Sequence, residues 1–306
     1  MVAALTLAIT GATGFVGARL LDAALAGGHS VRALTRRPQP ALDGVTWVDG
    51  ALDRPDCLDA LVEGADAVIH VAGVVNAPDA AGFEAGNVIG TGAVLAAAEK
   101  AEIARFVHVS SLAAREPKLS LYGASKARSE ALVAASPLAT AIVRPPAIYG
   151  PGDRELLEMF KMAARGLVLL PPPGRLSLLH ADDLARLLLA LASPTAPSRI
   201  TVEPDDGRSG GWTHREFADA LAAAVGRSKV GKVSMARPVL AAAARADRLL
   251  RGSKAKLTPD RASYFSHPDW VADPARAVAA GVWQPKIPTP QGLADTAQWY
   301  RSADWL

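Results

Sequence analysis

The sequence predicts an α/β protein with a Rossmann-type, doubly wound parallel sheet and a smaller C-terminal lobe, on three observations. Short apolar runs alternate with alanine- and leucine-rich stretches of helical length through the first half of the chain, which is the pattern of a parallel sheet with crossover helices. A glycine-rich turn follows the first apolar run. The 306 residues exceed the about 100–200 of an ordinary domain, so a second lobe is expected.

The expected strands are short apolar runs separated by turns and helical segments. They are Leu5–Thr10, Ser30–Leu34, Ala67–His70, Phe106–Ser110, Thr140–Val143 and Arg199–Val202. Further along, Thr213 and Glu216 have the spacing of a capping box, in which each side chain bonds to the backbone of the other residue. A helix is therefore expected from there through Ala224.

The composition is that of a globular protein and excludes some partners. The formal net charge of +3 is small, and Lys and Arg are interleaved with Asp and Glu, so we expect no nucleic-acid partner. The single cysteine, Cys57, fits a reducing compartment and is given no role. No basic segment precedes the first apolar run, and no run reaches the about 18 apolar residues of a membrane span, so we expect a cytoplasmic protein.

The glycine-rich turn Thr10–Gly17 lies between the first expected strand and a helix. Glycines tolerate unusual backbone angles there and let the backbone approach a pyrophosphate, which the free N–H groups of the helix N-terminus attract. This position indicates a dinucleotide-binding site, and the alternative is a purely structural turn. The expected cofactor contacts are Gly11, Thr13, Gly14, Phe15, Val16 and Gly17.

The end of the second expected strand bears on which nicotinamide cofactor binds. An acidic residue there would accept hydrogen bonds from the ribose hydroxyls of NAD and would repel a 2′-phosphate. The strand instead runs into Thr35, Arg36 and Arg37, and a planar guanidinium suits a phosphate. This favours NADP(H) over NAD(H), unless the two arginines are only solvated charges.

Tyr122 and Lys126 are four residues apart and therefore share one face of a helix. A free tyrosine has a pKa of about 10, and a neighbouring ammonium favours the phenolate. The pKa of Tyr122 therefore moves closer to neutral, and the residue can act as an acid/base. Ser111, just after an expected strand, can donate to an oxygen that becomes negative during hydride transfer; Ser110 is the alternative if the register differs by one. No grouping has metal-ligand spacing, so no metal is expected.

With these residues in this order, the chain resembles the extended short-chain dehydrogenase/reductase family. That family contains NAD-dependent nucleotide-sugar epimerases and dehydratases, 3β-hydroxysteroid dehydrogenases and dihydroflavonol-type reductases. The resemblance covers nearly the whole chain. Its motifs are Thr10–Gly17, Val68–Gly73, Asn87–Thr91, Arg144–Gly152, His180–Ala185, Gly281–Pro285 and Trp299–Arg301.

The resemblance implies a role for each matching residue. Ser111 orients the substrate oxygen, Tyr122 transfers its proton, and Lys126 tunes Tyr122 and holds the nicotinamide ribose. Asn87 is then structural or part of a proton relay, and the alternative for His180 is a structural, hydrogen-bonded role. Further cofactor contacts fall on Leu52, Val71, Ala72, Gly73, Tyr122, Lys126, Pro145 and Ile148, and substrate contacts on Ser111, Asn87, Ala147 and His180.

Two features depart from the family's pattern. Its adenine-side Gly-Asp-Leu segment reads Gly50–Leu52 with alanine in the middle, so the aspartate contact is missing unless Asp49 or Asp53 replaces it. Eleven positions lead from Ser111 to Tyr122, fewer than in the sugar-modifying members, so the loop between them is trimmed.

The substrate class follows from what the second lobe lacks. Sugar-modifying relatives place an asparagine at the position of Ala147 to hold a pyrophosphate, and alanine offers no hydrogen bond. Leu167–Leu170, Pro171–Pro173 and Leu176–Leu179 predict an apolar cleft wall. Arginines that could meet a diphosphate are Arg208, Arg215, Arg237 and Arg251. We therefore expect a small, non-nucleotide ketone or aldehyde as the substrate.

The expected organisation is a dinucleotide-binding domain at residues 1–150, continued by about 171–205, and a substrate-binding lobe at 151–170 and 206–306. Homodimers are common in the family that the chain resembles. Three functions stay open: a ketone or aldehyde reductase, a nucleotide-sugar epimerase or dehydratase that recycles its cofactor, and a non-catalytic dinucleotide-binding regulator. The presence of Ser111, Tyr122 and Lys126 argues against the third, since a pure binder needs none of them.

Overall fold

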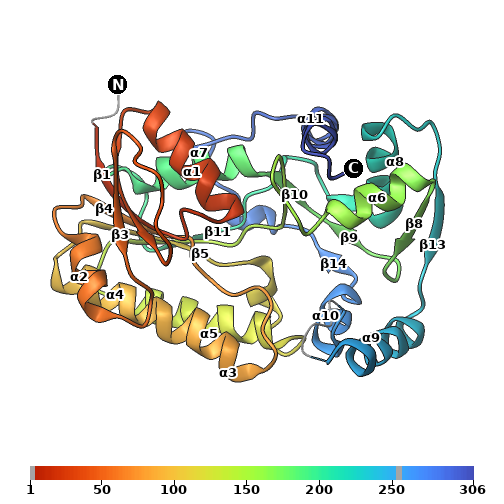
Figure 1. The fold of residues 1–306 in the computed structure, drawn as a ribbon, viewed down its shortest axis with the longest axis horizontal. Coiled ribbons are helices and arrows are strands. Elements are labelled where there is room, and N and C mark those ends of the chain that lie inside the picture. Colours follow the sequence, from red (N-terminus) through yellow and green to blue (C-terminus); the bar gives the residue numbers. More distant parts are fainter. Residues whose placement is uncertain (1–3, 253–256) are drawn as a thin grey trace. The chain divides into compact units, whose positions relative to one another are not determined.

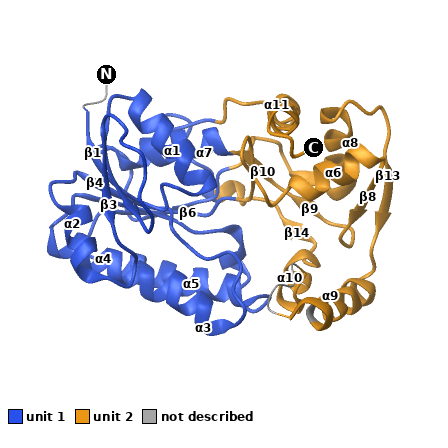
Figure 2. Ribbon diagram, viewed as in Figure 1, with its two compact units in different colours: residues 1–145, 181–204, 276–284 blue, residues 146–180, 205–275, 285–306 orange. Residues whose placement is uncertain are grey.

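The computed structural model describes residues 4–252 and 257–306 and divides the chain into two compact units (Figure 2). The first unit comprises residues 1–145, 181–204 and 276–284, and the second comprises 146–180, 205–275 and 285–306. Among the described residues, no helix is long and apolar enough to cross a membrane.

A seven-stranded sheet forms the centre of the first unit (Figure 1). Its order is β11-β6-β5-β4-β1-β2-β3, and every neighbouring pair is parallel. The strands are β1 (Thr6–Thr10), β2 (Ser30–Thr35), β3 (Val45–Asp49), β4 (Ala67–His70), β5 (Arg105–Val109), β6 (Thr140–Val143) and β11 (Ile200–Val202). The predicted Rossmann-type sheet is confirmed. The strand order reverses between β1 and β4, and in such sheets ligands bind outside the carboxyl ends of the strands at that point.

Helices cover both faces of this sheet. They are α1 (Phe15–Ala26), α2 (Pro55–Val62), α3 (Ala80–Phe83), the π-helix η1 (Glu84–Ile89), α4 (Gly90–Lys100), the 3-10 helix η2 (Leu112–Arg115), α5 (Leu121–Ala135) and α7 (Ala181–Ala192). Helix α1 packs on α7, while α2, α4 and α5 share a hydrophobic core with the other face (Figure 1). Because both faces are covered, successive strand residues such as Leu7, Ala8 and Ile9 are all buried.

The edge strand β3 is missing from the strands expected from the sequence. Its residues, Val45–Asp49, include polar side chains, and none of the five is fully buried. The strand is held by parallel pairing with β2 alone. A half-exposed edge strand carries a weak hydrophobic signal, which is why the pattern of apolar runs does not reveal it.

The second unit combines small sheets with helices. Strand β7 (Ala147–Tyr149) pairs with β10 (Leu178–His180), β9 (Arg175–Leu176) pairs with β12 (Trp212–Thr213) and β14 (Asp269–Trp270), and β8 (Leu167–Leu170) pairs with β13 (Gly231–Ser234). The helices are α6 (Leu157–Arg165), α8 (His214–Ala224), α9 (Arg237–Arg251), α10 (Pro259–Phe265), α11 (Thr289–Ser302) and the 3-10 helix η4 (Pro274–Arg276). Phe160, Phe217, Leu293 and Tyr300 lie in its main core. The predicted capping box of Thr213 and Glu216 forms at the start of α8.

The unit boundaries differ from those expected in three ranges of residues. Residues 146–150 and 171–180 belong to the second unit, because β7 and β10 pair with each other outside the central sheet. Residues 276–284 belong to the first unit. There the Trp283 indole donates to the carbonyl oxygen of Asp183 at 3.0 Å, and the Glu203 amide donates to the carbonyl of Arg276 at 2.9 Å. Such long-range bonds leave no local signal in the sequence.

Candidate active site

The glycine turn between β1 and α1 contacts the turn that follows β4. Gly11 has a φ of +75°, and a Cβ built on it would lie 2.7 Å from the backbone nitrogen of Ala72. A Cβ on Gly17 would overlap the carbonyl oxygen of Gly11. Only glycine fits these two positions, so the turn is tight and its backbone is unobstructed.

The N-terminus of α1 fits an anionic group. Gly14 is the N-cap residue, no side chain caps the helix, and its first turn contains no acidic residue. The N–H groups of Phe15, Val16 and Gly17 lie in this first turn, where no intrahelical acceptor exists. Thr13 and Gly14 are exposed beside them. These residues fit the pyrophosphate of a dinucleotide, which the uncapped N–H groups and the helix dipole would hold.

Lys126 lies on α5 with its amine buried next to the turn after β4. Its Nζ donates to the carbonyl oxygen of Val109 at 2.8 Å, and a Cβ on Gly73 would lie 3.8 Å from that nitrogen. Burial lowers the pKa of Lys126 to about 8, and the charge of Glu130 partly opposes this. The amine is therefore mainly an ammonium at neutral pH, with donors beyond the one that Val109 receives.

Tyr122 lies one helical turn before Lys126, on the same face of α5. Its ring is half-buried and packs against Phe83 of α3, with ring centroids 6.1 Å apart. Ser120 caps the helix, since its Oγ accepts from the Gly123 amide at 2.9 Å. The cap fixes the start of α5 and with it the position of Tyr122.

Ser111 is held next to α5 by the 3-10 helix η2, of which it is the N-cap residue. Its Oγ accepts from the Ala113 amide at 3.2 Å, which leaves the hydroxyl proton available to donate. A Cβ on Gly123 would lie 2.6 Å from the carbonyl oxygen of Ala113, so η2 packs directly on the first turn of α5. Ser111 and Tyr122 therefore lie on adjoining elements.

Ser110, the alternative to Ser111, is committed to a buried ion network. Its hydroxyl donates to the carboxylate of Glu130, which also accepts two bonds from Arg144 at 2.9 and 2.7 Å. Arg144 further donates to Glu203 at 3.2 Å. This network, which the sequence pattern did not show, braces β5 and β6 and makes Ser111 the better donor to a substrate.

Asn87 holds the backbone, and its side chain has no free donor for the substrate contact expected of it. Its Oδ1 accepts from the Val74 amide at 2.6 Å, while its Nδ2 donates to the Val74 carbonyl and to Ser125 Oγ, both at 2.9 Å. Both amide protons are thus used, and the residue is only 1% exposed. Of the two roles weighed for Asn87, these bonds favour the structural one, in which it joins the turn after β4 to α5.

A buried histidine joins the strand ends around the glycine turn. His70 Nδ1 lies 2.7 Å from Thr10 Oγ1, and Nε2 lies 3.0 Å from Thr91 Oγ1. Because the Thr91 hydroxyl donates to the Asn87 carbonyl at 2.6 Å, it accepts from Nε2–H, and Nδ1 accepts from Thr10. Burial lowers the pKa of His70 to about 3, helped by the charge of Lys126, so the ring is neutral.

Arg36 and Arg37 are exposed immediately after β2. The Thr35 hydroxyl donates to the Arg37 carbonyl at 2.7 Å and accepts from the Arg37 amide at 3.3 Å, which turns the chain at this point. Asp49 lies beside Thr35 in the register of β2 and β3. The geometry is open to a ligand phosphate, and both arginines remain predicted contacts.

Leu52, expected on the adenine side, is half-buried and packs against the core beneath α2 and α4. Gly50 is required there because a Cβ would overlap the Sγ of Cys57. Cys57 is therefore a packing residue, in line with the absence of an assigned role.

The remaining predicted residues fall in different units. Pro145 is in the first unit and accepts from the Leu112 amide at 3.1 Å. Ala147 and Ile148 are half-buried on β7 of the second unit. His180 is 4% exposed, and its ring packs edge-on against Tyr149 with centroids 5.2 Å apart. This burial favours the structural role for His180.

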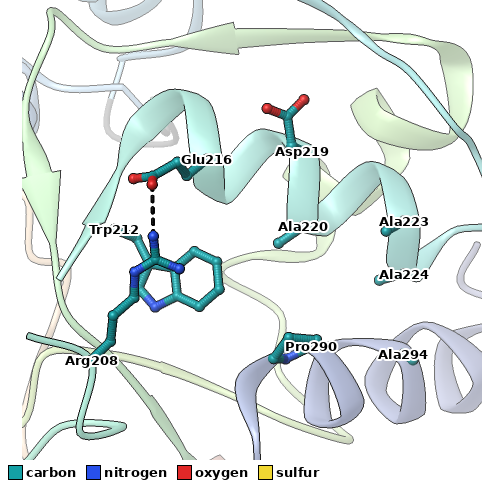
Figure 3. A pocket seen from close by; sticks show the side chains of 9 residues that line it. All are labelled: Arg208, Trp212, Glu216, Asp219, Ala220, Ala223, Ala224, Pro290 and Ala294. Atoms are coloured by element: carbon teal, nitrogen blue, oxygen red, sulfur yellow. Dashed lines mark hydrogen bonds and ion pairs between the residues drawn. The ribbon is translucent and has the colours of Figure 1, made fainter.

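The second unit contains a pocket of about 460 Å³ beside α8 and α11 (Figure 3). Alanines and Pro290 form much of its lining. Its Arg208 guanidinium stacks 4.0 Å above the Trp212 ring and donates to Glu216 at 2.6 Å, as Figure 3 shows. This arginine is already paired, so the pocket carries no assigned role.

Comparison with known proteins places these features in a wider group. The NAD dependent epimerase/dehydratase family model matches residues 7–201. The ceramide reductase of Caulobacter vibrioides is 40% identical over 308 residues, covering 98% of this chain and 95% of that protein. The 2-alkyl-3-oxoalkanoate reductase of Stenotrophomonas maltophilia is 30% identical, covering 93% and 96%.

Solved structures with the same fold are more distant in sequence. MoeE5 in complex with UDP-glucose and NAD is 20% identical with a TM-score of 0.76, covering 97% of this chain and 99% of that one. The Bordetella bronchiseptica enzyme WbmG in complex with NAD and UDP is 18% identical with a TM-score of 0.76, covering 98% and 96%. At these identities the likeness shows the fold alone.

The sheet and its glycine turn define a Rossmann-type dinucleotide-binding protein. The chain belongs to the NAD-dependent epimerase/dehydratase family. It is an NAD(P)-dependent oxidoreductase of the extended short-chain dehydrogenase/reductase type.

Proposed function

We propose that this enzyme reduces a ketone on a long-chain apolar compound, a ceramide-type lipid or its close chemical analogue, to a secondary alcohol at the expense of NADPH. The observation that carries the proposal is the match along nearly the whole chain to a protein named ceramide reductase. A ceramide carries a secondary hydroxyl, and a reductase that forms it acts on the corresponding ketone. The name of the 2-alkyl-3-oxoalkanoate reductase likewise describes the reduction of a ketone on an alkyl chain.

The residues at the carboxyl edge of the sheet support this reaction. The ketone carbon gains a hydride from the reduced nicotinamide, which is the chemistry that the bound cofactor supplies. Tyr122 donates its phenolic proton to the ketone oxygen as that oxygen becomes negative. The free hydroxyl proton of Ser111 orients the same oxygen and stabilises its charge.

Lys126 supports the proton transfer without contacting the ketone. Its ammonium, fixed by Val109, lies one turn from Tyr122 and lowers the cost of forming the phenolate. In this proposal, the donors that Val109 does not use would bind the hydroxyls of the nicotinamide ribose. Helix α5 thus contributes, in this proposal, both the residue that orients the cofactor and the residue that donates the proton.

We further propose NADP(H) as the preferred cofactor. Arg36 and Arg37 are exposed at the end of β2, the place where a 2′-phosphate lies in this fold, and the residues directly after that strand include no carboxylate. The structural neighbours named above contain NAD, so this preference concerns this chain and not the fold in general.

The apolar preference of the substrate does not come from the leucines expected to form a cleft wall. Val168, Leu170 and Leu178 are fully buried in the core of the second unit, and Leu167 and Leu169 face outward with exposed fractions of 47% and 43%. A strand whose residues alternate between core and solvent explains both observations.

Most of the arginines weighed as ligands of a diphosphate already bind other groups of the second unit. Arg208 pairs with Glu216, and Arg251 pairs with Asp247 at 3.1 Å. Arg237 donates to the carbonyl of Ser266 at 3.3 Å. Three of the four arginines weighed as diphosphate ligands therefore already have protein partners, which favours a substrate without a nucleotide.

Assays with purified protein separate the candidate reactions. We expect NADPH to be consumed with the long-chain keto amide that corresponds to a ceramide, faster than NADH, and we expect no reaction with UDP-glucose. The Tyr122→Phe variant serves as the control for adventitious reduction. Conversion of UDP-glucose without net oxidation of NADPH would replace the proposal by the epimerase function.

A further inference from the structure

Helix α9 exposes an apolar stripe to solvent. Leu240 and Ala244, one turn apart, are buried against Ala262 of α10. The opposite face carries Val239, Ala242, Ala246, Leu249 and Leu250, whose spacing of three and four residues puts them on one side of the helix. All five are exposed, and Leu249 and Leu250 reach 86% and 85%. Single exposed leucines are common, but a stripe on the solvent face of a helix marks an interaction surface.

The strand that leads into α9 adds to this apolar surface. Strand β13 ends at Ser234, shortly before α9 begins at Arg237 (Figure 1). Val233 of β13 lies opposite Leu169 of β8 in the register, and their exposed fractions are 49% and 43%. Two consecutive elements thus present apolar side chains to solvent.

Positive charge is concentrated in the same segment. Residues 234–261 contain seven arginines and lysines against two aspartates, an excess of five, whereas the whole chain has an excess of only three. The expectation of evenly interleaved charge therefore does not hold here. Arg245 is exposed on α9 next to the apolar stripe, beside Leu249 on the helix surface. An exposed apolar stripe in a segment of net positive charge is the pattern of a helix that lies in the interface of a membrane.

We propose that α9 docks the enzyme on an anionic lipid bilayer, with Leu249 and Leu250 inserted among the acyl chains and Arg245 at the headgroups. A second copy of the chain fits this face less well, because pairing two such segments brings two excesses of positive charge together. A bilayer of anionic lipids offers the opposite charge and an apolar layer at once. The proposal does not depend on the identity of the substrate, although a lipid ketone would reside in the same bilayer.

Vesicle co-sedimentation tests the proposal with the full-length protein and without any substrate. The probes are vesicles of phosphatidylcholine alone and vesicles of equal parts phosphatidylcholine and phosphatidylglycerol. We expect the protein to bind the anionic vesicles, and binding to fall as salt is added, because salt screens the charges. The double variant Leu249→Gln, Leu250→Gln should bind at least about tenfold more weakly.

Two further variants separate the apolar from the charged contribution. Arg245→Gln should weaken binding to anionic vesicles about fivefold, the effect of one basic residue near such a surface, and leave the weak binding to neutral vesicles unchanged. Leu42→Gln removes a leucine that is 44% exposed in the first unit and should change nothing. NADPH binding, measured for every variant, shows that each is folded.

Three outcomes overturn the proposal. The first is wild-type protein that stays in solution with anionic vesicles at low salt, and the second is a double variant that binds as well as the wild type. The third is a concentration-dependent dimer, lost in the double variant and formed without vesicle binding, which would assign the face to a second copy. Failure here leaves the ketone reductase function intact, since the assay for that function contains no vesicles.

Discussion

The carboxyl edge of the central sheet buries polar side chains, whereas helix α9 exposes apolar side chains to solvent. At the sheet edge, Thr10, His70 and Lys126 are buried, and each has a hydrogen-bond partner. On α9, Leu249 and Leu250 are almost fully exposed. Burying polar groups is costly unless they are paired, and exposing leucine gives up the stabilisation of burial. Under the two proposals, the buried polar groups at the sheet edge position the reacting groups, and the exposed leucines of α9 bind the enzyme to a membrane.

The largest effect is expected at Tyr122, the proposed proton donor. Tyr122→Phe keeps the ring that packs on Phe83 and removes only the hydroxyl. Turnover should fall by at least the ~10²-fold of a lost general acid, with NADPH affinity nearly unchanged. Steady-state kinetics and a cofactor titration measure the two quantities. Unchanged turnover would remove Tyr122 from the mechanism.

The buried ammonium should affect both turnover and cofactor binding. Lys126→Ala leaves the Val109 carbonyl without its donor and removes the charge beside Tyr122. Each quantity should fall about tenfold or more, as expected for the loss of a charge-assisted hydrogen bond. A variant that loses turnover while binding NADPH as before would show that Lys126 does not hold the ribose.

The amine of Lys126 also predicts a pH dependence. Its pKa, lowered by burial to about 8, means that the ammonium is lost as the pH rises through that value. NADPH affinity of the wild type should therefore weaken above pH about 8, and that weakening should be absent in Lys126→Ala. Titrations at several pH values with both proteins compare the two curves.

Arg36 tests whether the exposed charges after β2 contribute to cofactor choice. Arg36→Ala should weaken NADPH by about 1.5–3 kcal/mol and leave NADH nearly unchanged, because only NADPH carries the 2′-phosphate. Cofactor fluorescence titration measures both affinities. Equal affinities for NADPH and NADH in the wild type would mean that Arg36 and Arg37 only face water.

The smallest effect concerns the neutral histidine of the sheet edge. The pKa of His70 is about 3 when folded, below the about 6.5 of an exposed histidine, so the unfolded chain binds more protons between these values. The free energy of unfolding should therefore fall on acidification through this range, by about 1.4 kcal/mol per pH unit for each such group. Burial also lowers the pKa of His108, which adds to the loss of stability on acidification.

Denaturant unfolding at several pH values isolates the contribution of His70. His70→Gln should reduce the slope of stability against pH by about one proton, whatever its effect on stability itself. A slope equal to that of the wild type would mean that His70 takes up its proton without unfolding.

The sequence predicts what is encoded by local spacing. The residues of the turn Thr10–Gly17 are close to one another in the sequence, and so are Tyr122 and Lys126. The geometry within each motif therefore follows from the strand and helix periods. The alternation of apolar runs predicts the central sheet for the same reason. Their catalytic and binding roles remain predictions that the variants above test.

Contacts between distant residues could not be predicted in this way. His70 joins Thr10 and Thr91, and Arg144 joins Glu130, through bonds that depend on how the strands are ordered. The same limit applies to the expected apolar wall at Leu167–Leu170, where the pattern shows apolar residues but not which side of a strand meets the core. Unit boundaries fail similarly, because they depend on which strands pair.

The reaction itself is tested most directly by following the hydride. NADPH deuterated on the transferable position of the nicotinamide is incubated with the long-chain keto amide and the wild-type enzyme, and the product is analysed by mass spectrometry. We predict one alcohol formed per NADPH oxidised, with the deuterium on the carbinol carbon, and product formed at least ~10²-fold more slowly by Tyr122→Phe. An alcohol without deuterium, or NADPH left unoxidised while a sugar nucleotide is converted, would contradict the account.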